Sequence, residues 1–381
     1  MNDLKDMIKQ GSALFKEGKL DRAEKVFADV LSREPDEIHA LKYMGIINLK
    51  LGDKVSAKDY FLRITTLKDD ADAYYLLGEI YNENNEFEKA LAFHKKALLT
   101  DSLKADISSK KFPFKDNYDE TVINCMLCGS DNYKTAWVGN QSSMALNYGV
   151  INPLRTWVKC SECGFIFANP CPTEKALNLW WHHYSVPKKD MRSWKYFSSE
   201  AVITKNIEVA ASRIKTIQKY CGRGKLFEIG ASVGIFLATA IEVGWDAAGI
   251  ELMENAVEAA KSFGIEILCG DFLKSDLGKG DFDAIAMWEV VEHTIDPKAF
   301  LLKANDMLKS GGIIALSTPN PESAFVRFKG KAWDLWKEPT HAHYFTPVTM
   351  KRLFLETGFE LLEYTQSPSH PWCMDVYGRK I

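Results

Sequence analysis

The stretch Lys225-Leu-Phe-Glu-Ile-Gly-Ala-Ser-Val-Gly-Ile-Phe-Leu237 decides the fold of the C-terminal half of this chain. It predicts a short buried strand, a turn of small residues and the start of a helix, the order that a nucleotide site at a strand's carboxyl end requires. Gly230 and Gly234 have no side chain, so the backbone can pass close to a ligand there. Glu228, near the end of the strand, can pair with a cation or a hydroxyl group.

Further strands and helices alternate after this turn, which predicts a doubly wound, Rossmann-like α/β domain with a mostly parallel sheet. Glu251 ends the second strand and is placed to bind both ribose hydroxyls of a nucleotide. Asp271 and Phe272 follow the third strand and suit an adenine amino group and ring face. The predicted strands are residues 247–251, 265–269, 282–288 and 312–317.

A nicotinamide-dependent dehydrogenase is the competing interpretation of a glycine-rich turn. Such enzymes have G-x-G-x-x-G after the first strand, whereas this turn has glycine only at positions 230 and 234. Residues 195 to 370 resemble the class I S-adenosylmethionine-dependent methyltransferases, and especially the ubiquinone-pathway O-methyltransferases. Ser232 departs from the family's first motif, which usually has glycine there. The resemblance implies that S-adenosylmethionine contacts Glu228, Gly230, Ser232, Gly234, Glu251, Asp271, Phe272 and Trp288.

The catalytic candidates follow the fourth strand, whose carboxyl end faces the crevice where ligands bind in this architecture. Methyl transfer needs an aligned acceptor and removal of its proton, so one base can suffice. His293 is our leading candidate for that base, and His343 is the second. A histidine that only caps or packs a helix is the alternative interpretation of this segment.

A divalent metal is a further hypothesis for the same segment. Glu289, Glu292 and His293 would share one helical face, and His341 and His343 follow later in the chain. Two carboxylates with two imidazoles can hold Mg or Mn. The run resembles the metal motif of small-RNA 3′-terminal 2′-O-methyltransferases, in which the metal orients the acceptor hydroxyl.

Two C-x-x-C-G knuckles precede the methyltransferase-like region. Glycine after each pair tolerates the tight turn that aims backbone amides at the sulfurs, and four thiolates leave no open coordination position. We therefore predict a structural zinc site rather than a catalytic one, with a redox pair as the alternative. The ligands are Cys125, Cys128, Cys160 and Cys163. The segment resembles the zinc-binding part of some sugar and natural-product methyltransferases, which implies that it covers the substrate side and that Tyr184 with His182 or His183 can reach the substrate.

The first hundred residues repeat a pattern of small residues and phenylalanine every 33 or 34 positions and resemble a tetratricopeptide array. Such an array binds a protein partner, mediates self-association, or serves only as a scaffold. The predicted domains are residues 1–107 (repeats), 108–120 (linker), 121–194 (zinc segment) and 195–381 (methyltransferase).

Composition sets the remaining expectations. With 48 basic and 51 acidic residues, the net charge of −3 gives no overall field that would attract nucleic acid or an anionic membrane. No apolar run approaches the ~18 residues of a spanning helix, and we expect a cytoplasmic protein.

The function hypothesis is O-methylation of a sugar or another small metabolite. C-methylation of a keto-sugar is the nearest alternative, followed by a protein, carrier-bound or nucleic-acid-terminal acceptor that the repeats recruit. A non-enzymatic assembly platform is the last alternative, and the intact acids Glu228, Glu251 and Asp271 argue against it.

Overall fold

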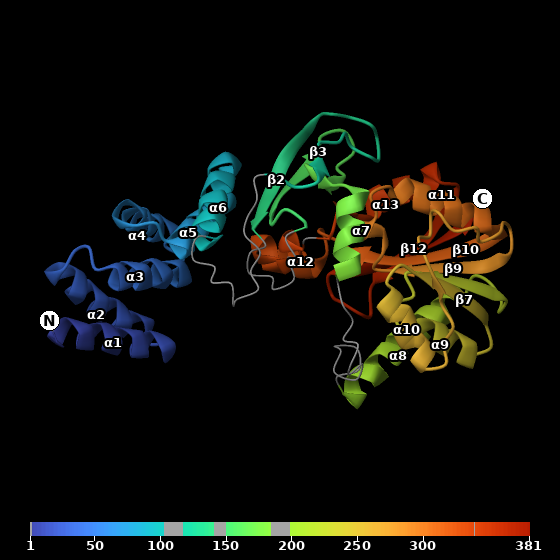
Figure 1. The fold of residues 1–381 in the computed structure, drawn as a ribbon, viewed down its shortest axis with the longest axis horizontal. Helices are drawn as coiled ribbons and strands as arrows, with labels where there is room; N and C mark the ends of the chain where they lie inside the picture. The colour runs from blue at the N-terminus through green and yellow to red at the C-terminus, as the bar shows by residue number, and fades with distance from the viewer. Residues whose placement is uncertain (1, 103–116, 141–149, 184–198, 339) are drawn as a thin grey trace. The chain divides into compact units, whose positions relative to one another are not determined.

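The computed structural model of the protein describes residues 2–102, 117–140, 150–183, 199–338 and 340–381 (Figure 1). Most of the predicted linker, and Tyr184, lie outside these residues. The chain forms two compact units, one of residues 1–116 with 135–155 and the other of residues 117–134 with 156–381. The boundaries between the units fall inside two strands, β2 (Tyr133–Asn140) and β3 (Leu154–Cys160), so the units differ from the predicted domains.

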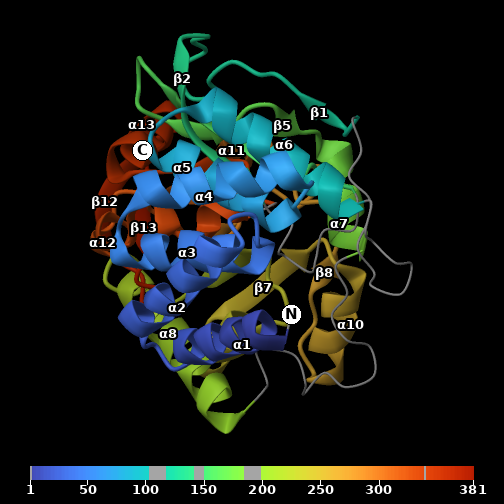
Figure 2. The ribbon, with the colours of Figure 1, turned by 90° about the vertical axis from the view of Figure 1, so that its left-hand side faces the viewer.

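The first unit is built on three helical hairpins, as the repeat pattern predicts. Consecutive helices pack in chain order (Figure 2). Gly18 and Gly52, with φ of 76° and 88°, end the first helix of the first two hairpins, where a left-handed residue is needed. The helices are α1 (Asn2–Lys16), α2 (Leu20–Arg33), α3 (Ile38–Leu51), α4 (Lys54–Leu67), α5 (Ala71–Glu83) and α6 (Phe87–Ser102).

A seven-stranded sheet organises the second unit, in the order β12-β13-β10-β9-β6-β7-β8. All neighbours among β6 to β10 are parallel, whereas β13 is antiparallel to both β10 and β12. The predicted mostly parallel sheet is therefore confirmed, with one antiparallel strand, β13, between β10 and the edge strand β12. The strands are β6 (Lys225–Ile229), β7 (Asp246–Glu251), β8 (Leu268–Cys269), β9 (Phe282–Trp288), β10 (Leu308–Pro319), β12 (Phe359–Gln366) and β13 (Cys373–Lys380).

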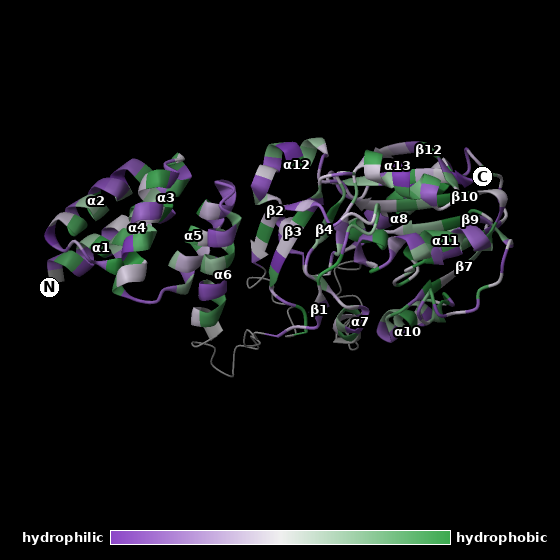
Figure 3. Cartoon of the chain, turned by 90° about the horizontal axis from the view of Figure 1, so that it is seen from above, coloured by the Kyte–Doolittle hydropathy of each residue, from purple (hydrophilic) through white to green (hydrophobic). Residues whose placement is uncertain are grey.

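Alternating residues of the central strands supply two separate cores, because successive side chains of a strand point to opposite faces. Leu226 and Ala284 pack with helices α8, α9 and α10, whereas Phe227 and Ile285 pack with α11 and α13. These buried strands are strongly hydrophobic in Figure 3. The helices are α8 (Glu200–Ile217), α9 (Ile235–Glu242), α10 (Glu254–Ser262), α11 (Pro297–Met307) and α13 (Pro347–Glu356).

The cysteine knuckles share the second of these cores. Cys125, Cys160 and Phe167 belong to the same buried cluster as Phe227 of the central strand. A four-stranded sheet in the order β11-β4-β3-β2 and a two-stranded sheet of β1 and β5 surround the knuckles. The remaining elements are β1 (Glu120–Thr121), β4 (Ile166–Ala168), β5 (Cys171–Pro172), α7 (Glu174–His183), the short helix η3 (Val291–His293), α12 (Ala324–Lys329), the short helices η4 (Gly330–Ala332) and η5 (Asp334–Lys337), and β11 (His343–Tyr344).

No helix in the described part of the chain is both long and apolar enough to cross a membrane.

Candidate functional site

The turn after β6 needs its glycines for two reasons. Gly230 and Gly234 have φ of 73° and 81°, which side-chain-bearing residues rarely adopt. A Cβ atom at Gly230 would also lie 2.6 Å from a methyl group of Val290, and one at Gly234 would lie 2.8 Å from Ile265. Ser232 between them has φ of 50°, so the position where the family has glycine is left-handed here as well. The backbone of this turn can therefore approach a bound ligand closely.

Glu251 fixes the shape of the same turn from the end of β7. One carboxylate oxygen accepts a hydrogen bond from the backbone N–H of Ser232 at 2.8 Å, and the other accepts one from Met253 at 2.9 Å. Burial raises the pKa of Glu251, while these backbone hydrogen bonds act in the opposite direction. Each oxygen keeps a lone pair that can accept a hydrogen bond from a ribose hydroxyl.

Glu228 is buried on the neighbouring strand with one carboxylate oxygen, Oε2, that has no hydrogen-bond partner among the described residues. Burial raises the pKa of this carboxyl well above its usual range, and the charge of Arg213 opposes the shift. A buried carboxyl with an unused acceptor atom is costly, so a bound group that donates to it would stabilise the site.

The other predicted cofactor residues occupy different surroundings. Asp271 accepts a hydrogen bond from the backbone N–H of Leu273 and pairs with Lys274 at 3.0 Å. Phe272 is buried against Phe300, with their ring centroids 5.2 Å apart, and so belongs to the core rather than to an open ring face.

Arg213 on α8 is a buried residue that the sequence analysis missed. Its guanidinium makes a two-point ion pair with Asp375, at 2.9 and 3.1 Å, and lies 4.2 Å above the ring of Trp288. It also donates to the hydroxyls of Ser367 and Ser369. Arg213 and Asp375 are 162 positions apart in the sequence, and no local pattern connects them.

Glu289 corrects one premise of the metal hypothesis. We expected Glu289, Glu292 and His293 on one helical face, but Glu289 has φ of 57° and lies before η3, which holds only residues 291–293. Its carboxylate accepts a hydrogen bond from Ser369 at 3.0 Å. The backbone turns sharply at Glu289, whose N–H still bonds to Ser317 on the adjacent strand.

Three of the predicted residues do come together. Glu292, His293 and His341 each offer a ligand atom, and these atoms lie within 4.8 Å of one another. Glu292 is buried, its pKa is raised well above the usual range by desolvation and by the charge of Glu289, and its Oε2 atom has no hydrogen-bond partner in the described ranges. The three side chains therefore form a compact acid–imidazole cluster at the end of β9.

Hydrogen bonds orient both imidazoles of this cluster. His293 Nδ1 lies 3.2 Å from the carbonyl oxygen of Thr340, so Nδ1 carries the proton and Nε2 carries the lone pair. The hydroxyl of Tyr344 donates to the carbonyl of Leu335, so it accepts from His341 Nδ1 at 3.2 Å, and His341 has the same tautomer. Burial lowers the pKa of His293 to about 4, which keeps the imidazole neutral near pH 7.

His343 is directed elsewhere. Its Nε2 donates to the carbonyl of Thr294 at 2.6 Å, and its ring stacks on Phe165 with centroids 5.6 Å apart. The side chain is fully buried, and burial lowers its pKa to about 4. These contacts favour His293 over His343 as the group that faces a substrate.

The four knuckle cysteines lie together, with their sulfur atoms all within 4.8 Å. Two sulfur pairs are 3.5 and 3.6 Å apart, close to the ~3.8 Å edge of a tetrahedral zinc–thiolate site. Gly129 and Gly164 both have positive φ, as the knuckle pattern predicts. Although burial acts to raise it, hydrogen bonds from the backbone of Cys163 and Glu162 lower the pKa of Cys160 to about 7, whereas burial raises the pKa of Cys125 and of Cys163.

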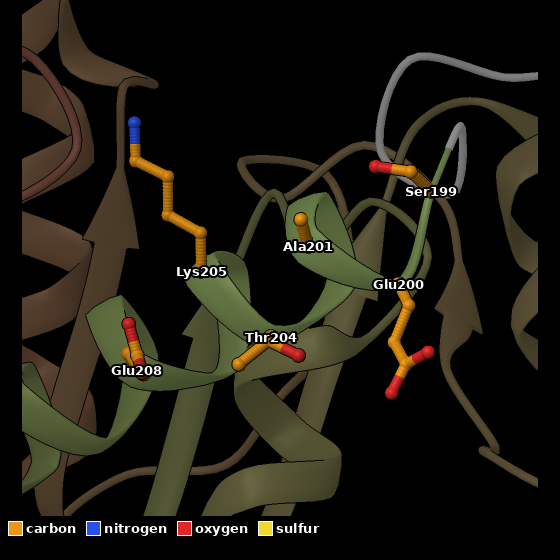
Figure 4. A pocket seen from close by; sticks show the side chains of 6 residues that line it. All are labelled: Ser199, Glu200, Ala201, Thr204, Lys205 and Glu208. Carbon is orange, nitrogen blue, oxygen red and sulfur yellow. The ribbon is translucent and has the colours of Figure 1, made fainter.

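A shallow hollow runs along the first turns of α8 (Figure 4). Its lining comes from one helix and its cap, and none of the predicted site residues takes part. We assign it no role in the candidate site. The lining residues are Ser199, Glu200, Ala201, Thr204, Lys205 and Glu208.

Known proteins share both parts of this architecture. Residues 204–364 match a methyltransferase domain family, and residues 8–68 and 71–102 match tetratricopeptide repeat families. A solved S-adenosylmethionine-dependent methyltransferase from Mesorhizobium loti has 18% sequence identity and a TM-score of 0.36, covering 44% of this chain and 96% of the other.

Two relatives are named ubiquinone biosynthesis O-methyltransferases. The protein of Dinoroseobacter shibae is 35% identical over 151 residues, which are 37% of this chain and 57% of the relative. That of Cereibacter sphaeroides strain KD131 is 30% identical over 171 residues, covering 42% of this chain and 67% of the relative. The match to the Dinoroseobacter protein thus spans little more than half of its length.

Proposed function

Because this chain belongs to the S-adenosylmethionine-dependent methyltransferases, we propose that it methylates a hydroxyl group of a small acceptor, with His293 as the general base. The observation that carries this proposal is the Glu292–His293–His341 cluster at the carboxyl end of β9. The relatives named as O-methyltransferases support an oxygen acceptor.

The residues around the first turn fit the methyl donor. Glu251 has lone pairs for the ribose hydroxyls, and Asp271 would accept from the adenine amino group. Glu228, which has an unused buried acceptor atom, would take a hydrogen bond from the bound donor. S-adenosylmethionine supplies a methyl group that its sulfonium already activates, so the protein has to align the acceptor and remove one proton.

In the proposed step, His293 Nε2 takes the proton of the acceptor hydroxyl. The oxygen lone pair forms the new O–CH₃ bond, the C–S bond breaks, and its electron pair stays on sulfur. His293 becomes an imidazolium ion, and this positive charge would favour the ionised form of the adjacent Glu292, whose pKa burial and Glu289 otherwise raise. The ring of Trp181 lies edge-on to His293, with centroids 5.3 Å apart, and would form an apolar wall for the acceptor.

A divalent cation is a second proposal for the same cluster. The carboxylate of Glu292 and the Nε2 atoms of His293 and His341 would hold Mg or Mn, and the metal would acidify the acceptor hydroxyl. Full activity in chelator would reject this variant of the mechanism. Loss of activity in EDTA, restored by Mg or Mn without refolding, would support it.

The acceptor class is tested by incubating the full chain with methyl-labelled S-adenosylmethionine and two sets of acceptors. One set contains nucleotide sugars, as the resemblance of the cysteine segment favours, and the other contains hydroxyl-bearing intermediates of ubiquinone biosynthesis, as the names of the relatives favour. We expect label in an O-methyl group of one set. Absence of transfer to both sets, from a protein that binds the donor, would contradict the proposal.

Binding of the methyl donor is tested by a substitution in the turn after β6. Gly230→Ala forces a methyl group against Val290 in a left-handed turn, so calorimetry should show S-adenosylmethionine binding weakened at least about tenfold. Gly264→Ala is the matched control, because Gly264 also has positive φ but has no atom within 4 Å of the added Cβ. Equal losses in both variants would mean that backbone strain, and not the clash with Val290 in the turn after β6, explains the effect.

A further inference from the structure

The three repeats differ at one packed position. In each repeat a glycine of the first helix lies against a ring from the second, so close that a Cβ atom on the glycine would be within 2.7 Å of that ring. In the first two repeats the ring is phenylalanine, and in the third it is histidine. The pairs are Gly11–Phe27, Gly45–Phe61 and Gly78–His94.

A second position changes in the same repeat. The residue four places after each of these glycines is Phe15 in the first repeat, Leu49 in the second and Asn82 in the third. The third repeat therefore has polar groups at two positions where the others are apolar. Asn82 and His94 have no exposed surface, and burying polar groups is unfavourable unless they are paired.

Both polar residues contact one end of β2. Both the oxygen and the nitrogen of the Asn82 side-chain amide bond to the backbone of one residue. The Oδ1 atom accepts a hydrogen bond from the N–H of Val138 at 3.1 Å, and the Nδ2 atom donates one to the carbonyl of Val138. His94 Nδ1 lies 3.4 Å from the side-chain amide of Asn140. The other ring nitrogen of His94 is 3.3 Å from a carboxylate oxygen of Glu79.

Apolar packing accompanies these polar contacts. The side chain of Val138 is buried in the same cluster as Leu77 and Ala90 of the third repeat. Asn140 is fully buried as well. An amide that pairs with both backbone groups of one residue copies the hydrogen bonding of a neighbouring β-strand, so Asn82 recognises an extended backbone.

We propose that the third repeat is a strand-docking site, and that its ligand is the segment 135–140 of the same chain. Asn82 binds the extended backbone, Val138 fills the apolar surface, and His94 with Asn140 fixes the register. This site is independent of the methyltransferase chemistry. The same segment of a second copy of the chain is the other occupant that the test must exclude.

The test measures amide hydrogen exchange of the full chain at two protein concentrations. The double variant Asn82→Leu/His94→Phe gives the third repeat the apolar residues of the second, so its helices should remain protected. We expect exchange in residues 136–140 to become at least tenfold faster, while α5 and α6 change by less than twofold. Asn48→Leu is the matched control, because Asn48 is a buried asparagine that bonds to Met44 of its own helix.

Asn140→Leu is the second variant, because it changes the ligand and leaves the repeats intact. It should also speed exchange in residues 136–140 without affecting α5 and α6. Unchanged exchange in both variants would overturn the proposal. So would equal loss of protection in the helices, which would make Asn82 and His94 ordinary core residues. Wild-type protection that rises with protein concentration would assign the site to a second copy instead.

Discussion

Cys160→Ser is expected to remove the zinc and to destabilise the second unit by about 3 kcal/mol or more. The reason is that Cys125 and Cys160 belong to the same buried cluster as the central strand residue Phe227. If the four sulfurs hold zinc as predicted, loss of one ligand leaves three thiols facing one another inside that core. The measurements are zinc content by mass spectrometry and urea unfolding of the full chain.

Cys269→Ser is the control for that experiment, because Cys269 is exposed and is not part of the four-sulfur cluster. It should keep one zinc per chain and unfold like the wild type. A Cys160→Ser protein with unchanged stability would show that the knuckles contribute little to the core. A wild-type protein that contains no zinc when purified from zinc-supplemented cells would contradict the metal assignment itself.

His293→Ala should lower kcat by about 10²- to 10⁴-fold, the usual contribution of a general base. Donor affinity should change by less than threefold, since His293 is not among the residues proposed to bind the donor. Burial lowers the pKa of His293 to about 4, so wild-type kcat should stay level down to about pH 5 and fall only below it. Single-turnover rates from pH 4.5 to 8 test the loss of kcat in the variant and the pH profile of the wild type.

The His341→Ala variant distinguishes a mechanism in which His293 is the general base from one in which a metal holds the acceptor. If a metal holds the acceptor, both histidine variants lose activity to a similar degree and both respond to added Mg or Mn. If His293 is a base, His341→Ala retains much more activity, because His341 then only packs against it, with ring centroids 4.6 Å apart. An active His293→Ala protein with an unchanged pH profile would remove His293 from the chemistry.

The central fold was predictable because its signals are local and periodic. Strands 247–251 and 282–288 were predicted to within one residue of the ends of β7 and β9, as each is an apolar run beside a turn. The hairpin of β12 and β13 was not predicted, and its attachment to the sheet depends on the pairing of β13 with β10, about 60 residues earlier in the chain.

The sequence predicted which kinds of residue form the candidate site better than it predicted how these residues are arranged. The sequence places Glu289 and Glu292 three residues apart, but it does not reveal that the backbone of Glu289 is left-handed and that no helix includes Glu289. His341 and His343 look equivalent in an H-x-H pattern, yet one approaches His293 and the other bonds to Thr294. No sequence pattern pointed to Arg213 as a site residue, because only the tertiary fold brings it to its partner Asp375.

The buried cluster that the cysteine knuckles share with the central sheet affects where the catalytic domain begins. Residues 204–364 match a methyltransferase family, but the buried cluster that contains Phe227 and Ile229 of that region also includes Val158, Phe165 and Phe167 from outside it. A fragment cut at the family boundaries would expose this apolar surface to water, at a cost of about 1.5–3 kcal/mol for each large side chain. We therefore expect the cysteine segment to be needed for the methyltransferase region to fold, and an expression fragment that omits it to aggregate.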